Sequence, residues 1–142
     1  MGKRIIARAR GRGTTTYRAP SHRFKGKTSY RNYDDKEKDG FILGKIIDLI
    51  HCSGHSAPLA KIKFETGEEI LLAAPLGIST NSTIKAGSSA SISNGNILPL
   101  KNIPIGTSIY NIEGNPGDGG KFIRSSGSSA QVIVKTGDKV TI

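Results

Sequence analysis

The sequence is poor in several residue types, and each shortage excludes a class of protein. Its 142 residues include no tryptophan and a single cysteine, Cys52, which excludes an intramolecular disulfide framework and fits a reducing compartment. No apolar run approaches the roughly 18 residues of a membrane-spanning helix, and no signal-peptide core follows the N-terminus. The composition therefore predicts a soluble, cytoplasmic chain with no membrane partner, long enough for about one ordinary domain or two very small ones.

Acidic residues are absent from the first 31 positions, where ten of the chain's 21 Lys and Arg are concentrated. The rest of the chain carries equal numbers of basic and acidic residues, so this segment holds the whole net charge of +10. Seven of the ten cations are Arg, whose planar guanidinium binds phosphate through two hydrogen bonds. Cations at this density gain most when phosphates replace their counterions, and the predicted partner is therefore nucleic acid.

The basic segment also interleaves aromatic side chains with its cations, and these offer flat faces for unstacked RNA bases. It has almost no aliphatic residue beyond Ile5 and Ile6, so we expect it to be disordered alone and ordered by folded RNA. A solubilising tail, a basic presequence and a membrane-surface tether are weaker alternatives. The RNA contacts predicted in this segment are Arg4, Arg8, Arg10, Arg12, Tyr17, Arg18, His22, Arg23, Phe24, Lys25, Lys27 and Arg31.

Beyond a charged hinge expected at residues 34–39, the pattern predicts short β-strands. Phe41–Ile50 is rich in β-branched residues and contains one glycine, which favours a long bent strand. Ala60–Phe64 alternates apolar and Lys residues and, after a Thr-Gly turn, forms a hairpin with Glu69–Ala74. This pattern, with no strong helix, predicts an all-β fold that contains an OB-like five-stranded barrel. Further strands are expected at Ser88–Ser93, around Ile97–Leu100, at Thr107–Ile112, at Gln131–Val134 and at Lys139–Ile142.

A glycine-rich segment, Gly114–Lys121, has the composition of a nucleotide phosphate loop but not its spacing. Asn115 stands where that motif needs a glycine, and Phe122 replaces the hydroxyl that would bind Mg²⁺. We interpret the segment as a tight loop that places backbone N–H groups and two basic side chains against RNA phosphates. The RNA contacts predicted here are Gly117, Gly119, Gly120, Lys121 and Arg124.

Other reactive residue types form no convincing site. His51, Cys52 and His55 supply up to three zinc ligands, which only His22 could complete, and a hairpin loop with incidental polar residues is the favoured alternative. The only feature that favours Cys52 as a nucleophile is its proximity to these histidines, which is weak support. Three carboxylates at the hairpin turn are expected to be solvated: Glu65, Glu68 and Glu69. We therefore predict no cofactor, no metal site and no enzymatic activity.

Several longer stretches of the chain are specific enough to compare with a known family. They are Gly11–Thr14, Tyr17–Lys25, Gly40–Ile50, Ser56–Ala60, Asn96–Leu100, Ile103–Gly106 and Glu113–Phe122, followed by Arg124, Ser126, Gly127 and Gln131. These stretches resemble the second protein of the large ribosomal subunit, in its archaeal and eukaryotic branch. The resemblance covers essentially the whole chain and is strongest in the glycine-rich segment.

This resemblance implies an rRNA-binding arm at residues 1–39, an OB-like barrel at 40–112 and the start of an SH3-like barrel at 113–142. It implies a structural constituent that binds large-subunit rRNA near the peptidyl-transferase region and supports assembly and subunit association. Neighbouring ribosomal proteins are implied partners. The chain stops partway into the family's second barrel, so a companion chain that completes this barrel is a further candidate partner. The alternative function is that of a free OB-fold translation factor or RNA chaperone.

The charge distribution predicts a steep salt dependence of RNA binding. If the basic segment contacts about 6–10 phosphates, the affinity should fall by roughly 10³–10⁵ between 50 and 200 mM salt, with duplex DNA as the upper guide. Removing residues 1–31 should flatten this dependence, measured as the slope of log Kd against log salt concentration. An unchanged slope would contradict the assignment of the electrostatics to this segment.

Overall fold

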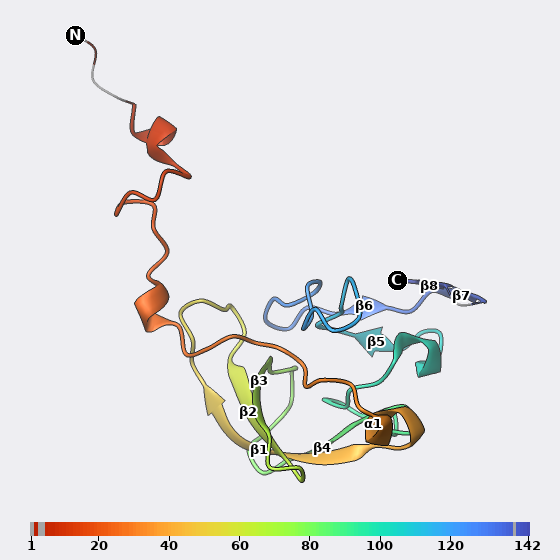
Figure 1. Ribbon diagram of the computed structural model, residues 1–142. Helices are drawn as coiled ribbons and strands as arrows, with labels where there is room; N and C mark the ends of the chain where they lie inside the picture. The colour runs from red at the N-terminus through yellow and green to blue at the C-terminus, as the bar shows by residue number, and fades with distance from the viewer. Residues whose placement is uncertain (1, 3–4, 138) are drawn as a thin grey trace.

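A computed structural model describes residues 2, 5–137 and 139–142 of the chain (Figure 1). The fold is all-β, as predicted, with little helix. No helix in these described ranges is long and apolar enough to cross a membrane. The elements, in chain order, are η1 (Ile6–Ala9), η2 (Ser21–Arg23), α1 (Asp35–Asp39), β1 (Ile42–Ile50), β2 (Leu59–Phe64), β3 (Glu69–Ala73), β4 (Thr83–Ala86), η3 (Leu100–Asn102), β5 (Ser108–Ile109), β6 (Ala130–Gln131), β7 (Val134–Thr136) and β8 (Lys139–Thr141).

The larger sheet is antiparallel, with the strand order β3-β2-β1-β4. The long strand predicted at Phe41–Ile50 is confirmed as β1, and the predicted hairpin is confirmed as β2 and β3. A register shift between Ile46 and Asp48 interrupts the pairing of β1 with β2, as a β-bulge does. One face of the sheet is buried around Ile42, Ile46, Ala60, Ile62, Phe64, Leu72, Ile84 and Ala86.

The strand expected at Ser88–Ser93 is wrong, and the fourth strand of the sheet is β4 instead. The serines serve a different purpose, because they hydrogen-bond the end of α1. Ser88 donates from its N–H to the carbonyl of Glu37 at 2.8 Å and from its hydroxyl to that of Lys38 at 2.5 Å. The strand expected around Ile97–Leu100 is reduced to one parallel bridge between Ala86 and Ile97.

A second hydrophobic cluster is built from Ile103, Ile109, Ile112 and Val132, with Leu98, Leu100, Ile123 and Val140 packed against it. β5 pairs with β6, so chain on both sides of the boundary expected at 112/113 shares one small sheet and one core. The expected C-terminal hairpin begins three residues late, as β7 paired with β8, because Gln131 pairs with Ser108. The closure of either set of strands into a barrel stays a prediction.

The basic segment divides into two parts with different surroundings. Residues 5–24, which we call the distal arm, extend away from the sheets in Figure 1. Thr28–Arg31, which we call the strap, is packed between the two hydrophobic units and includes the buried Thr28. The N–H of Ser29 donates to the carbonyl of Leu71 in β3 at 3.3 Å, and the Tyr30 hydroxyl donates to that of Asn111 at 2.6 Å. The expected disorder therefore does not extend to the strap.

Arg31 is the centre of the contacts made by the strap. Its guanidinium donates to carboxylates of Glu37 at 2.5 Å, Asp34 at 2.7 Å and Glu68 at 2.8 Å. The side chains of Arg31 and Glu37 are only 7% and 6% exposed. Burial raises the pKa of the Glu37 carboxyl, and the hydrogen bond from Arg31 opposes this rise.

These contacts correct two expectations. Residues 34–39 are not a hinge: Asp35–Asp39 form the short helix α1, and Asp34 caps it by accepting a hydrogen bond from the Glu37 N–H. Glu68 belongs to the Arg31 cluster and is not merely a solvated turn charge. A deletion that tests the arm should accordingly stop at Phe24, because removing residues 1–31 would also remove the strap.

Replacing Arg31→Leu should lower the free energy of unfolding by about 3–5 kcal/mol, because it leaves the buried Glu37 carboxylate without a cation. Urea denaturation of the full chain measures this change. Lys38→Leu is the matched control, since the ion pair of Lys38 with Asp35 is mostly exposed and should contribute about 0.5 kcal/mol or less. Equal losses in the two variants would contradict the role of Arg31, whereas partial recovery in Arg31→Leu/Glu37→Leu would support it.

Candidate RNA interface

The predicted RNA contacts in the distal arm are presented to solvent. Arg8, Arg10, Arg12, Tyr17, Arg18, His22, Arg23 and Phe24 are all exposed. Arg10 lies over the ring of Tyr17, with its Cζ atom 5.4 Å from the ring centroid. Among the described residues, none of these arginines makes an ion pair with a carboxylate. Arg4 lies outside the described residues. The distal arm therefore presents a series of guanidinium groups that are available to phosphates.

The arm meets the rest of the chain at the loop after β1. The Phe24 ring lies so close to Gly54 that a Cβ there would be 2.8 Å from a ring carbon. The N–H of Lys25 donates to the buried Cys52 thiol at 3.5 Å, while the side chains of Lys25 and Lys27 remain exposed. Hydrogen bonds from the N–H groups of Lys25 and Gly54 lower the pKa of the Cys52 thiol.

The same loop forms no metal centre within the described part of the chain. His55 approaches the Cys52 sulfur, with 3.3 Å between Nδ1 and Sγ. No group of three or more His, Cys, Asp or Glu side chains gathers there or elsewhere in the described residues in a way that could hold a metal ion. Cys52 instead anchors the junction between the arm and the loop.

The N–H groups of the glycine-rich loop are bound by carboxylates of the chain itself, which corrects the expected arrangement. The Glu113 carboxylate accepts from the N–H groups of Gly117 at 3.1 Å and Gly119 at 3.0 Å. The Asp118 carboxylate accepts from three more N–H groups, those of Gly114, Asn115 and Gly120, each at 3.1 Å. Two carboxylates of the chain thus occupy the N–H groups that were expected to meet phosphate. Sequence reasoning missed both acceptors, although an Asp two residues before a loop glycine, as Asp118 is before Gly120, is a typical signal for such a local bond.

The pKa of Asp118 reflects the hydrogen bonds that its carboxylate accepts in this loop. Desolvation, the largest influence, acts to raise the pKa of Asp118, but the backbone N–H groups of Asn115, Gly120 and Gly114 and the charge of Lys121 outweigh it and lower the pKa. Lys121 itself is exposed. In this loop, therefore, Lys121 is a basic side chain that remains at the surface.

Two loop glycines are required by close packing within the protein. A Cβ on Gly119 would lie 3.1 Å from the Cα of Ser29 in the strap, and a Cβ on Gly120 would overlap the Asn111 side chain. Gly117 has nothing within 4 Å of a built Cβ. All three have positive φ angles, between 82° and 87°. Gly119 and Gly120 thus serve the fold, and Gly117 is the loop glycine that a ligand can approach.

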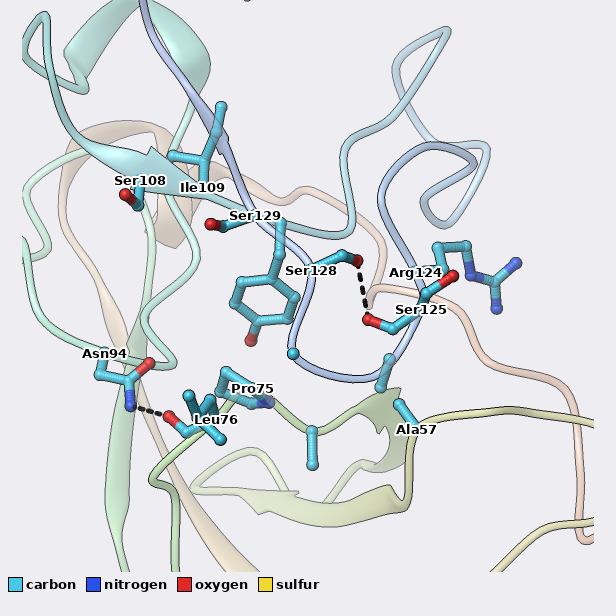
Figure 2. A pocket seen from close by; sticks show the side chains of 14 residues that line it. Ala57, Pro75, Leu76, Asn94, Ser108, Ile109, Arg124, Ser125, Ser128 and Ser129 are labelled. Atoms are coloured by element: carbon cyan, nitrogen blue, oxygen red, sulfur yellow. Dashed lines mark hydrogen bonds between the residues drawn. The ribbon is translucent and has the colours of Figure 1, made fainter.

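Arg124 lies half-buried beside a small cavity between the two units (Figure 2). Its guanidinium donates to the hydroxyl of Thr28 in the strap. The cavity has a volume of about 170 Å³ and is lined by Ala57, Ala73–Leu76, Asn94, Ser108–Tyr110, Arg124, Ser125 and Gly127–Ser129. Desolvation raises the pKa of Tyr110 to about 12. In Figure 2 the Arg124 side chain points away from Pro75 and Leu76, toward the edge of the cavity.

Comparisons with known proteins identify the class to which the chain belongs. A family model described as "Ribosomal Proteins L2, RNA binding N-terminal domain" matches residues 3–86. A second, described as "Ribosomal Proteins L2, C-terminal domain", matches residues 93–142. The chain therefore belongs to the ribosomal protein L2 family.

Individual relatives agree with this assignment. Proteins named "Large ribosomal subunit protein uL2" match the whole chain at 56% identity in Methanosphaera stadtmanae, 53% in Methanothermobacter thermautotrophicus and 48% in Methanocaldococcus jannaschii. In each case the match covers 59% of the relative's length. The chain thus spans somewhat more than half the length of these relatives.

The packing of the loop predicts different costs for two otherwise similar substitutions. Gly117→Ala and Gly119→Ala both force alanine into a left-handed backbone conformation, which costs about 1–2 kcal/mol. Only Gly119→Ala also pushes against the strap, so it should lower the unfolding free energy further and speed hydrogen exchange at the Ser29 amide. Chemical denaturation and amide exchange measure the two effects. Equal behaviour of the variants would show that the loop does not pack on the strap.

Proposed function

We propose that this chain is a structural constituent of the large ribosomal subunit that binds large-subunit rRNA. One observation carries the proposal: the distal arm extends from the folded part with its arginines exposed and without carboxylate partners. Such a series gains free energy by replacing the counterions of an RNA backbone. Family membership agrees with this chemistry, since one matching family model is described as RNA-binding.

The RNA contacts follow from the side chains that the structure leaves available. We propose the exposed cations and aromatic rings from Arg8 to Lys27, together with Lys121 and Gly117, as contacts with rRNA. Arg31, Gly119 and Gly120 are assigned to the fold instead, because protein atoms already occupy their surroundings. Arg124 is proposed as a contact from the cavity edge.

The more specific parts of the proposed function, namely the location within the subunit and the role in assembly, are based on the family resemblance. We propose a position near the peptidyl-transferase region, with support of subunit assembly and association, and no catalysis by the chain itself. The proposed partners are large-subunit rRNA and neighbouring ribosomal proteins, in the cytoplasmic ribosome. The proposed architecture is an OB-like barrel followed by part of an SH3-like barrel. The division between them is best placed in residues 87–97, because β4 ends at Ala86 and the second cluster begins at Leu98.

A companion polypeptide is a further proposed partner of the second unit. Ile105, Ile133, Val134 and Ile142 are 40–61% exposed. Three of them lie in or beside the two-stranded sheet of β7 and β8, and an isolated two-stranded sheet is marginally stable in water. A polypeptide that adds strands at this sheet would cover these side chains.

Sucrose-gradient sedimentation tests the proposed function directly. A tagged full chain should sediment with large subunits in cell extract and remain there in moderate salt, whereas a free translation factor or RNA chaperone should remain near the top. The triple variant Arg8→Gln/Arg10→Gln/Arg12→Gln should reduce the sedimenting fraction several-fold. The control Lys36→Gln/Lys101→Gln/Lys139→Gln removes three exposed charges outside the arm and should have a much smaller effect. Absence of the unmodified chain from large subunits would overturn the proposal.

A further inference from the structure

The four-stranded sheet carries lysines on the face opposite its hydrophobic core. The register pairs Lys45 of β1 directly with Lys63 of β2, and Leu43 with Lys85 of β4. Lys45 and Lys85 are therefore diagonal neighbours across β1 and β4, because Lys45 itself is opposite Thr83. Side chains directly opposite have Cβ atoms about 4.5–5.5 Å apart, and diagonal neighbours are about 7–8 Å apart. Three adjacent strands thus present three ammonium groups on one surface.

In the described part of the chain, none of these three lysines forms an ion pair with a carboxylate. The ion pair on this face joins a fourth lysine, Lys61, to Glu69 at 2.8 Å. Asp48 is on the same surface, but its carboxylate accepts a hydrogen bond from the Leu49 N–H at 2.8 Å. Lys45 and Lys63 are exposed. Lys63 also lies directly opposite Glu69 of β3, whose carboxylate forms its ion pair with Lys61. Lys45 is opposite Lys63 and Thr83 and has no carboxylate across either neighbouring strand, so the uncompensated positive charge on this face is centred on Lys45.

An aromatic ring borders the same charges. Phe41 is 43% exposed, and the ammonium of Lys85 lies 4.8 Å from its ring centroid. Phe41, Leu43 and Lys45 have the same parity in the extended chain, so they share a face. Lysines next to an exposed ring form a surface typical of nucleic-acid binding, where cations meet phosphates and rings meet bases or sugars.

The placement of Lys45 opposite Lys63 costs stability in the free protein. Like charges directly opposite each other in an antiparallel pair are destabilising. A phosphate between the two ammonium groups would convert this repulsion into attraction. The register of β1 and β2 is fixed by the core residues on the other face, so the backbone positions of the two lysines cannot separate without moving the core.

We propose that this lysine face, defined by Lys45, Lys63 and Lys85, is a second RNA-docking surface that receives an rRNA sugar–phosphate backbone. The inference rests on the proposed function and extends RNA contact from the distal arm to the folded sheet. Sequence analysis noted alternating lysines in the second strand but did not connect them with Lys45 and Lys85, because that connection depends on the strand register.

The test compares the double variant Lys45→Gln/Lys63→Gln with the control Lys36→Gln/Lys101→Gln in the full chain. The probe is transcribed large-subunit rRNA of Methanosphaera stadtmanae, the source of a 56% identical relative. Each lost phosphate contact should reduce the slope of log Kd against log salt by about 0.7–0.9. The sheet variant should therefore lose about 1.4–1.8 from the slope, and the control less than half as much. The free sheet variant should be at least as resistant to urea as the unmodified chain.

The distal-arm triple variant separates this proposal from the function on which it rests. If the arm variant weakens binding and the sheet variant matches the control, the lysine face is overturned while the proposed function stands. If the sheet variant alone weakens binding, the lysine face stands and the arm is not the principal contact. Loss of an associated acidic protein with unchanged RNA binding would also overturn the proposal. A gain in urea resistance together with a reduced salt slope is the expected result.

Discussion

The three-carboxylate contact of Arg31 is the interaction on which the arrangement of this chain depends. A guanidinium that is removed from solvent must be paired, because an unpaired buried charge costs several kcal/mol. The partners of Arg31 come from three places: the start of α1, the middle of α1 and the turn before β3. The cation also lies 5.7 Å from the centroid of the Phe64 ring, at the edge of the core. These contacts hold the strap across the fold.

The strap connects parts of the chain that share few other contacts. Ser29 covers the open edge of β3 by bonding Leu71, which protects an edge that is otherwise free to pair with another strand. Tyr30 and Thr28 contact the second unit through Asn111 and Arg124. A segment that composition assigns to RNA binding is therefore also a structural tie. Among the cations of the basic segment, only those that have no carboxylate nearby remain available to bind phosphate.

Local patterns predicted the sheet but not the contacts made across it. β1, β2 and β3 could be predicted, because β-branched content, alternation and a Thr-Gly turn act within one or two strands. β4 was missed because a four-residue strand gives little periodic signal, and the serines after it were mistaken for a strand. The role of Arg31 is invisible in the sequence, since its acidic partners include one 37 residues away. Charge density shows that a segment is basic, whereas three-dimensional proximity decides which of its cations are already paired.

The glycine-rich loop is a second case in which composition does not show which groups are already paired within the fold. Its composition indicates an anion-binding loop, and it does bind anions, but they are the chain's own Glu113 and Asp118 carboxylates. An external phosphate would have to displace groups that are covalently held at the site and whose charge repels it. The positive φ angle of Gly119 then has a structural reason, because it brings the loop backbone against Ser29. The stretch with the strongest family resemblance thus holds the strap in place and leaves Lys121 and Gly117 at the surface, where RNA can approach.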